Sequence, residues 1–422
     1  MELTTRKKII YTAVVVVSFI GAAELAVRLG CWAIGRVPYT AATPWMVADD
    51  ELLYVFRPNY EGKVYLVQSR INNHGLRDDD FTTRKPKGTR RVLCLGDSRT
   101  FGYLVDQDEA YPSQLERLLR ERYPSGRIEV LNAGRPAYSI YQGLRYLELR
   151  GLQFEPDVVT VGFGSNGRRF VLRREQADSA EWFRHVARDL RLRHQVRFSY
   201  ALLALSKVLR RVIGVDTWSR DVLALPSQRL DNLPCRVEGD TLRRRLRQLV
   251  RLCHERRIPV VILIMADAPS IEQAFDDGMQ LRSQEQYDEA VEAFARIGRD
   301  PADPATEQWY RALVHYEIGL TREAEGRTSE ALATFRESAQ AAAVWSISGG
   351  TAVRHGRDYL KILREVAEEL KVPRVEIAER FARRPELFTD HCHFTAEGHR
   401  LIAEAVAECL AEHRLLEPVS KP

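Results

Sequence analysis

The sequence has little cysteine for its length, with six cysteines among 422 residues. Disulfide-stabilised secreted domains carry far more, so the chain is not a disulfide scaffold. No two cysteines form a Cys-x-x-Cys pair, and a zinc ribbon or a thioredoxin-like site therefore has no support. The cysteines are Cys31, Cys94, Cys235, Cys253, Cys392 and Cys409. Cys94 and Cys253 stand among apolar residues and are expected in the core.

A large excess of charge of one sign is also missing. Lysine and arginine number 63 against 58 aspartate and glutamate residues, and the resulting net charge of +5 gives no reason to expect nucleic acid as a partner. Hydrophobic residues make up 45% and charged residues 29%, which excludes wholesale disorder and fibrous folds. At roughly 100–200 residues per domain, the chain should hold two or three units.

Long apolar runs are rare, and the one near the amino terminus stands out. Residues 9–23 contain no charged side chain and follow a basic tripeptide at 6–8. If the run continues to Leu29, its length of about 20 residues suits one crossing of a lipid bilayer. The sequence therefore predicts a membrane-spanning helix at this end of the chain.

The flanks of this run predict its orientation. Glu24 and Arg28 are spaced to pair at the far membrane interface, where Trp32 would serve as an anchor. The positive-inside rule keeps the amino end in the cytoplasm, so residues 1–36 are interpreted as a cytoplasmic tip and a transmembrane signal-anchor helix. The remainder would be extracytoplasmic, and periplasmic in a bacterial cell. A cleaved signal peptide is the alternative.

The pattern changes after the membrane-proximal segment at 37–89, which is polar and contains several prolines. Within it, residues 63–67 alternate as a short strand would. Beyond Arg91, short apolar runs alternate with helical patterns, which indicates a parallel α/β sheet covered by helices on both faces. The runs lie at 92–95, 128–131, 158–161 and 260–264.

Two helical stretches interrupt this alternation, and the first, residues 176–236, is basic. Between Glu181 and Ile213 there are eight lysine or arginine residues against two acids. The basic residues are Arg184, Arg188, Arg191, Arg193, Arg197, Lys207, Arg210 and Arg211. Leucine and aromatic residues are interleaved with them. The stretch is either a lid or membrane-surface helix that faces anionic headgroups, or a solvated helical insertion.

The second stretch, residues 270–345, contains an internal repeat with a 41-residue spacing. The recurring pairs are Gly278 and Gly319, Ala290 and Ala331, and Phe294 and Phe335. Small and aromatic residues at these offsets are typical of two packed antiparallel helices, and the pattern resembles tetratricopeptide repeats. Because about three repeats are needed to bury a continuous core, this pair should lean on the α/β body or on a protein partner. A plain helical hairpin is the alternative.

A serine follows the first apolar run directly, in the turn formed by Gly96, Asp97 and Ser98. The carboxyl end of the sheet is where open α/β folds place their ligand sites, and backbone N–H groups of the next helix suit a developing oxyanion there. An activated serine also needs a base and an acid that orients the base. Asp390 and His393, three residues apart near the other end of the chain, supply both in one short turn.

These residues resemble the SGNH hydrolases, also called the GDSL esterase/lipase family, over roughly 90–175, 240–268 and 350–415. The resemblance implies an α/β fold with a three-layer, flavodoxin-like parallel sheet. The two insertions would divide the hydrolase domain into a first part at 90–175, a middle part at 237–269 and a last part at 346–422.

The family's sequence blocks imply a role for each matching residue. The first block is Gly-Asp-Ser at 96–98, which makes Ser98 the nucleophile and places its N–H in the oxyanion hole. The third block begins at Gly164, and it would assign Gly164 and Asn166 to the same oxyanion hole, with Asn166 donating its side-chain amide. The fifth block, Asp-x-x-His, makes His393 the general base and Asp390 its orienting partner.

The second block departs from the family pattern. Its usual glycine, whose N–H enters the oxyanion hole, falls on Ala137. The donor survives, but the Cβ could crowd the acyl group or demand a backbone φ that only glycine takes easily. Gly134 is a neighbouring alternative. The family's frequent aspartate after the third-block asparagine is here Gly167. These departures bear on rate and substrate more than on the class of reaction.

We therefore expect a membrane-anchored serine ester hydrolase that forms an acyl-enzyme on Ser98 and needs no metal or organic cofactor. Its substrate would be an acyl ester of a small molecule, a lipid or an acetylated glycan. One alternative is an O-acetyltransferase or acetylesterase that acts on exported polysaccharide. Another is a catalytically degenerate envelope scaffold that binds a protein through the repeat hairpin.

The histidine-rich turn at the end of the chain also raises the question of a metal. Asp390, His391 and His393 are potential ligands, but no second ligand cluster accompanies them, and a metal site is not favoured. His391 and His399 are interpreted as local hydrogen-bonding or surface residues.

Overall fold

The computed structural model describes five ranges of the chain: 4–34, 43–205, 234–297, 304–347 and 357–417. Single residues inside these ranges are excepted, namely Leu66, Ser125, Ser165, Phe170, Leu172, Arg173, Arg197 and Ala266. Four residues of the predicted basic stretch (Arg197, Lys207, Arg210 and Arg211) and the middle residue of the third block, Ser165, thus lie outside the described residues.

A five-stranded parallel sheet forms the centre of the molecule. Its strands are β5 (Thr89–Gly96), β6 (Arg127–Gly134), β7 (Val158–Gly162), β8 (Val260–Leu263) and β9 (Arg374–Val375). Their order across the sheet is β6-β5-β7-β8-β9, and every neighbouring pair is parallel. Numbered along the chain within this sheet, that is the 2-1-3-4-5 order of flavodoxin-like folds. The predicted fold class is confirmed, and only the short strand β9 was missed.

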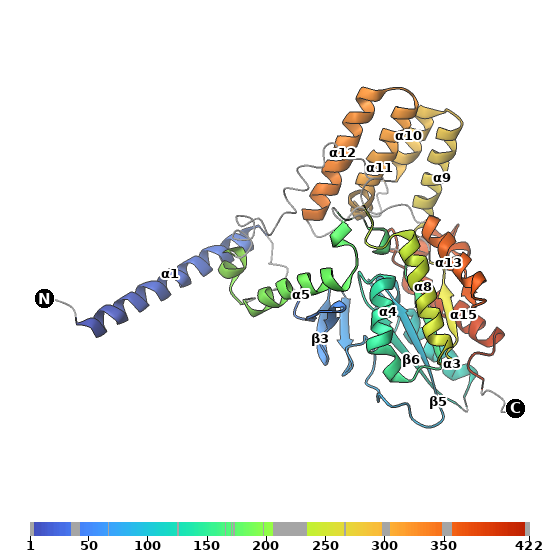
Figure 1. Cartoon of the computed structure of the whole chain (residues 1–422), viewed down its shortest axis with the longest axis horizontal. Helices are drawn as coiled ribbons and strands as arrows, with labels where there is room; N and C mark the ends of the chain where they lie inside the picture. Colours follow the sequence, from blue (N-terminus) through green and yellow to red (C-terminus); the bar gives the residue numbers. More distant parts are fainter. Residues whose placement is uncertain are drawn as a thin grey trace.

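Helices cover both faces of this sheet, which makes three layers (Figure 1). One face carries α4 (Ile140–Leu149), α8 (Gly239–His254) and α13 (Arg357–Glu369). The other carries α3 (Tyr111–Arg122) and α15 (Ala396–Glu412). Shorter elements connect these layers: α2 (Ser98–Phe101), α14 (Ile377–Arg380), and single 3-10 turns at Gly151–Phe154, Asn166–Arg168, Arg174–Gln176 and Pro385–Leu387.

The strand residues divide between the two faces because successive side chains point in opposite directions. In β5, Leu93 and Leu95 join the core beneath α4 and α8, while Val92 and Cys94 join the core beneath α3 and α15. Cys94 and Cys253 are both fully buried, as predicted. All six cysteines are free thiols.

Two antiparallel hairpins precede the sheet. The first pairs β1 (Met46–Asp49) with β2 (Leu53–Phe56), and the second pairs β3 (Tyr60–Val64) with β4 (Val67–Ile71). The expectation of one strand across 63–67 was wrong, because the chain reverses at Tyr65, whose φ is 55°. Aromatic residues of the first hairpin pack into the main core, so the segment is part of the body.

Four helices form a separate layered group beside the sheet (Figure 1). They are α9 (Pro269–Ser283), α10 (Tyr287–Arg296), α11 (Pro304–Ala324) and α12 (Thr328–Ile347). A core of its own holds the group together, and Phe388 of the body packs against it.

The repeated residues have the same role in both halves of this group. A Cβ added to Gly278 would lie 2.6 Å from the ring of Phe294, and one added to Gly319 would lie 2.6 Å from the ring of Phe335. Each glycine therefore allows the ring of the following helix to approach its backbone. The internal repeat in the sequence corresponds to two helical hairpins with equivalent packing.

The amino-terminal helix α1 (Thr5–Ala33) projects away from the body (Figure 1). It is long and apolar enough to span a membrane, and a signal sequence has the same character. Glu24 and Arg28 form the expected ion pair at 2.6 Å. Glu24 also accepts hydrogen bonds from the backbone N–H groups of Tyr200 and Ala201, so the insertion meets α1 at this point.

The basic stretch begins with α5 (Ala180–Gln195), which runs from the body toward α1 (Figure 1). Some of its charge is neutralised by the first hairpin, because Arg191 pairs with Asp50 at 2.8 Å and Arg184 lies 3.9 Å from Glu51. The basic face is therefore only partly available to an anionic surface.

Candidate active site

Ser98 stands where β5 ends and α2 begins. The turn is tight, since a Cβ at Gly96 would overlap the hydroxyl oxygen of Thr100. Asp97 is fully buried, and its carboxylate accepts the backbone N–H of Arg99 at 3.0 Å. The strand–turn–helix geometry thus presents Ser98 at the carboxyl end of the sheet, where the sequence predicted it.

The structure brings the predicted acid, base and nucleophile together in one line of hydrogen bonds. His393 Nε2 lies 2.8 Å from Ser98 Oγ, and His393 Nδ1 lies 2.6 Å from Asp390 Oδ2. Ser98 and His393 are 295 positions apart in the sequence, and only the folded sheet joins them. With the Nδ1 proton donated to Asp390, Nε2 is free to accept the serine proton.

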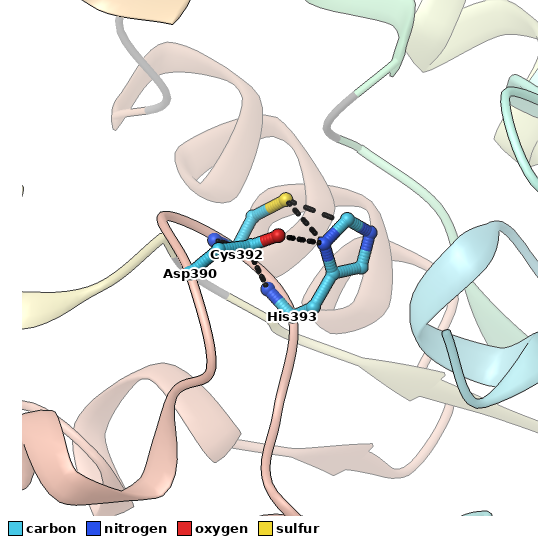
Figure 2. A group of neighbouring side chains, drawn as sticks. All are labelled: Asp390, Cys392 and His393. Carbon is cyan, nitrogen blue, oxygen red and sulfur yellow. Dashed lines mark hydrogen bonds and ion pairs between the residues drawn. The ribbon is translucent and has the colours of Figure 1, made fainter. Parts of the chain in front are cut away.

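A short turn of backbone holds Asp390 and His393 in this relation. Asp390 Oδ1 accepts the backbone N–H groups of Cys392 at 2.9 Å and His393 at 2.8 Å. Phe388 and Phe394 form an antiparallel bridge at the base of the turn. The carboxylate and the imidazole ring face one another across it (Figure 2). Both oxygens of Asp390 are therefore engaged, which fixes the carboxylate against rotation.

The charge of Asp390 is stabilised in place. Burial alone would raise the pKa of Asp390, but the charge and hydrogen bond of His393, with smaller contributions from His391 and the Cys392 N–H, hold that pKa well below its usual range. The carboxylate is ionised at neutral pH and can stabilise an imidazolium on His393. The ring of Tyr103 packs against that imidazole at 4.6 Å between centroids.

Asp390, Cys392 and His393 also lie close enough to one another to hold a metal ion (Figure 2). A soft metal such as zinc would need the thiolate of Cys392. Burial and the neighbouring Asp390 charge raise the pKa of that thiol well above its ordinary value. Both His393 nitrogens already face Asp390 and Ser98, so the cluster fits a hydrogen-bonded relay better than a metal site.

Ala137 lies in a turn beside the end of β5. Arg135 N–H donates to the carbonyl of Gly96 at 3.0 Å, which ties the turn to the strand that carries Ser98. Ala137 has a φ of 65°, a value that favours glycine, as the departure from the family pattern suggested. No acceptor in the described part of the chain bonds to its N–H.

Asn166 joins this turn to the end of β7. Its side-chain amide donates to the Tyr138 carbonyl at 3.1 Å, which leaves the second amide proton for another acceptor. Gly164 stands between β7 and Asn166, with room around it. The alternative donor Gly134 has a different role, because its N–H bonds to Asn132 Oδ1 at 3.1 Å and a Cβ there would overlap the backbone of Phe101.

The other departure, Gly167, has a steric reason. A Cβ there would lie 3.2 Å from the ring of Tyr359 and 3.3 Å from Val237. The backbone carbonyl of Gly167 also accepts the Val237 N–H at 3.0 Å. Tyr359 and Val237 therefore leave little room for an aspartate side chain at this position.

Several buried charged residues beneath the site were not predicted from the sequence. Arg99 pairs with Asp97 at 3.0 Å, and Arg168 pairs with Asp267 at 2.6 Å. Arg236 donates to the Ala137 carbonyl at 2.9 Å. An arginine in a basic sequence gives no sign of being buried. The partners of Arg168 and Arg236 each lie 99 positions away, so local patterns could not have found those two contacts.

His391 and His399 are not surface residues. They are exposed by only 5% and 0%. His399 Nδ1 accepts the backbone N–H of Tyr111 at 3.2 Å, so it has a hydrogen-bonding role, but with a partner 288 positions away in the sequence. Burial, with the nearby positive charge of Arg77, lowers the pKa of His399 to about 3 and keeps it neutral.

Comparisons with known proteins identify the family of the chain. The model of the GDSL-like lipase/acylhydrolase family matches residues 94–317, somewhat more than half of the chain. The match contains Ser98, Ala137 and Asn166 and ends before Asp390. No curated protein matches the sequence.

Solved structures of the same kind are similar at low identity. A lipase/acylhydrolase from Enterococcus faecalis is 14% identical, with 79% of this chain and 100% of that one covered and a TM-score of 0.37. The acetylxylan esterase Axe2 from Geobacillus stearothermophilus is 14% identical, with coverages of 78% and 94% and a TM-score of 0.36. Likeness at this level does not identify a substrate.

Proposed function

Because the chain belongs to the GDSL-like lipase/acylhydrolase family, we propose that it is a serine ester hydrolase whose nucleophile is Ser98. The observation that carries the proposal is the continuous hydrogen-bonded line from Asp390 through His393 to Ser98. A carboxylate, an imidazole and a hydroxyl in that order are the groups that acyl transfer to serine requires.

In the first half of the reaction, Ser98 Oγ attacks the ester carbonyl carbon while its proton passes to His393 Nε2. The carbonyl oxygen becomes an oxyanion, for which the N–H groups of Ser98 and Ala137 and the free amide proton of Asn166 are the donors. Collapse of this intermediate breaks the bond to the alcohol. His393 returns the proton to the leaving oxygen, and the acyl group remains on Ser98.

In the second half, water replaces the alcohol. Its proton passes to His393 Nε2 as its oxygen attacks the acyl carbonyl, and the same donors hold the second oxyanion. His393 then protonates Ser98 Oγ, and a carboxylic acid leaves. Asp390 stays ionised throughout and stabilises the imidazolium, in agreement with its depressed pKa. Short acyl esters, including acetyl esters, are the substrates that we propose.

The test is replacement of Ser98 in the full-length chain. Ser98→Ala should abolish hydrolysis of p-nitrophenyl acetate and covalent labelling by a fluorophosphonate. Ser283→Ala, a serine of the α9–α12 group whose hydroxyl bonds only to a nearby backbone carbonyl, is the matched control and should behave as the wild type. Undiminished turnover or labelling of Ser98→Ala would contradict the assignment.

We also propose that α1 anchors this activity to a membrane, with the hydrolase on the extracytoplasmic side. The support is the length and composition of α1 together with the basic residues at 6–8. In membranes from cells that express the full chain, the protein should resist extraction at alkaline pH. Protease should reach residues 43–417 only from the extracytoplasmic side, and release of the whole chain into the soluble fraction would contradict the anchor.

The α9–α12 group is proposed as a binding unit for a protein partner. Its support is the pair of equivalent helical hairpins, which have a core of their own. Deletion of residues 270–345 should preserve ester hydrolysis while a partner that purifies with the full chain is lost. Loss of folding on deletion would instead make the group a structural part of the body.

A further inference from the structure

The turn that carries Ala137 has the form of a type II β-turn. Tyr138 N–H donates to the Arg135 carbonyl at 3.1 Å and closes the turn across four residues. Pro136 occupies the second position, and Ala137 occupies the third with its positive φ of 65°. Type II turns favour proline and glycine at these positions, and the positive φ of the third position is unfavourable for alanine.

The orientation of one peptide unit depends on this turn type. Types I and II differ mainly by a flip of the central peptide, here the unit that contains the Pro136 carbonyl and the Ala137 N–H. The peptide is trans, so its C=O and N–H point in opposite directions. Without other contacts, Ala137 would favour the type I turn. In that turn the central peptide is flipped, and the Ala137 N–H, the proposed oxyanion donor, points in the opposite direction.

Two side chains from distant parts of the sequence hold the type II form. The hydroxyl of Tyr54, in β2, donates to the Pro136 carbonyl. Arg236 Nη1 donates to the Ala137 carbonyl at 2.9 Å. The two peptides on either side of the Ala137 Cα are therefore both fixed by their oxygens.

Both of these side chains are themselves held. Arg236 is only 13% exposed, and its guanidinium contacts both oxygens of Asp178 at 2.9 Å. Asp178 also accepts the hydroxyl of Ser139, the residue that follows the turn. Tyr54 is 4% exposed, and its ring meets that of Tyr138 edge-on at 5.3 Å. Neither group can move away without breaking other contacts.

We propose that Tyr54 and Arg236 are positioning residues that keep the Pro136–Ala137 peptide in its type II orientation and so aim the Ala137 N–H at the oxyanion. They supply by hydrogen bonding what the family's glycine supplies by conformational freedom. The inference rests on the proposed ester hydrolysis at Ser98. Neither residue belongs to a sequence block that matches the family.

The first test removes one hydroxyl. Tyr54→Phe keeps the ring and its packing but frees the Pro136 carbonyl, so that the peptide can flip. Loss of one oxyanion donor lowers turnover by about 10²–10³-fold, and partial loss should lower kcat at least about tenfold. KM should stay within about twofold, because the donor acts in the transition state. Tyr60→Phe, which also removes a hydroxyl bonded to a backbone carbonyl, is the control and should leave kcat unchanged.

The decisive test adds Ala137→Gly. Glycine takes a positive φ without the penalty of an L-residue, which is worth about fivefold to thirtyfold in favour of the type II turn. Ala137→Gly should therefore restore much of the kcat that Tyr54→Phe loses. Arg236→Lys, which cannot make all the bonds of the guanidinium, should show the same loss and the same rescue.

Three outcomes are informative. Recovery of kcat by glycine in both backgrounds supports the proposal. An unchanged kcat for Tyr54→Phe, or a loss that glycine does not relieve, overturns it. Ser98→Ala separates this inference from the proposed function: if Ser98→Ala is inactive and Tyr54→Phe is fully active, the ester hydrolase assignment stands and only the positioning role fails.

Discussion

The two sides of the active site are built in different ways. On the triad side, Asp390 and His393 share one short turn, and backbone N–H groups within three residues hold the carboxylate. On the oxyanion side, the turn at Ala137 depends on Tyr54, Asn166 and Arg236, which come from three separate parts of the chain. The base and its acid are thus organised locally, whereas the oxyanion donors are organised by packing. Damage to the triad side should be severe, and damage to the oxyanion side should be partial.

The largest expected effect tests the triad side. Asp390→Asn should keep the turn but present an amide to His393 Nδ1, which favours the wrong imidazole tautomer and lowers kcat by about 10⁴-fold. The measurement is kcat for p-nitrophenyl acetate, with Glu386→Gln as an exposed control nearby. A loss below tenfold would mean that Asp390 does not orient His393, and would remove the contrast between the two sides.

A smaller loss is expected on the oxyanion side. Asn166→Ala removes an amide donor and its bond to Tyr138, and kcat should fall by about 10²–10³-fold with little change in KM. Asn132→Ala is the control, because the Asn132 amide bonds, among the described residues, only to backbone groups of Phe101 and Gly134. This variant should lower stability and leave kcat unchanged. If Asn166→Ala changes KM and leaves kcat intact, Asn166 contacts the substrate rather than the oxyanion.

The α9–α12 group extends the comparison, because its helices contain none of the residues proposed to act on the ester. Gly319→Ala places a Cβ 2.6 Å from the ring of Phe335 and should lower the free energy of unfolding by about 1–3 kcal/mol. The measurement is urea unfolding, with the exposed Leu332→Ala on the same hairpin as the control. Because Ser98, His393 and Asp390 do not belong to the core of this group, kcat should be unchanged, and a parallel loss of kcat would show that the two regions are coupled.

The last prediction concerns acid stability near the triad. His399 has a pKa of about 3 in the folded chain against 6.5 for an ordinary histidine, because it is buried. Only the unfolded chain takes up this proton between those values. The stabilising contribution of the neutral side chain is therefore complete above pH 6.5 and is lost as the pH falls toward 3.

Between pH 7 and pH 5, proton uptake by His399 in the unfolded chain lowers the free energy of unfolding of the wild type by about 2 kcal/mol. Urea unfolding of the wild type and of His399→Gln at both pH values measures this change. The variant should lose stability at pH 7, where its contact with Tyr111 is weakened, and should show less change on acidification. An equal change in both proteins would show that His399 is not the acid-sensitive group.

Much of the scaffold was predictable from short patterns. Four of the five sheet strands were expected because β-branched and apolar runs of that length are typical of buried parallel strands. Strand β9 was missed because two residues, Arg374 and Val375, carry no periodic signal. The turn at Tyr65 was missed because alternation in residues 63–67 fits either one strand or the two arms of a hairpin.

The sequence by itself determined the residues of the proposed site: a serine after a buried strand, an Asp-x-x-His pair, and an alanine where the family has glycine. These depend on residue type and short spacing, which a linear chain records directly. Only the tertiary structure decided which buried charges and hydroxyls support them. Tyr54 and Arg236 act through single hydrogen bonds to backbone carbonyls that are 82 and 99 positions away. Such bonds leave no pattern in the chain, because a backbone carbonyl is the same at every residue and only folding selects which one a side chain meets.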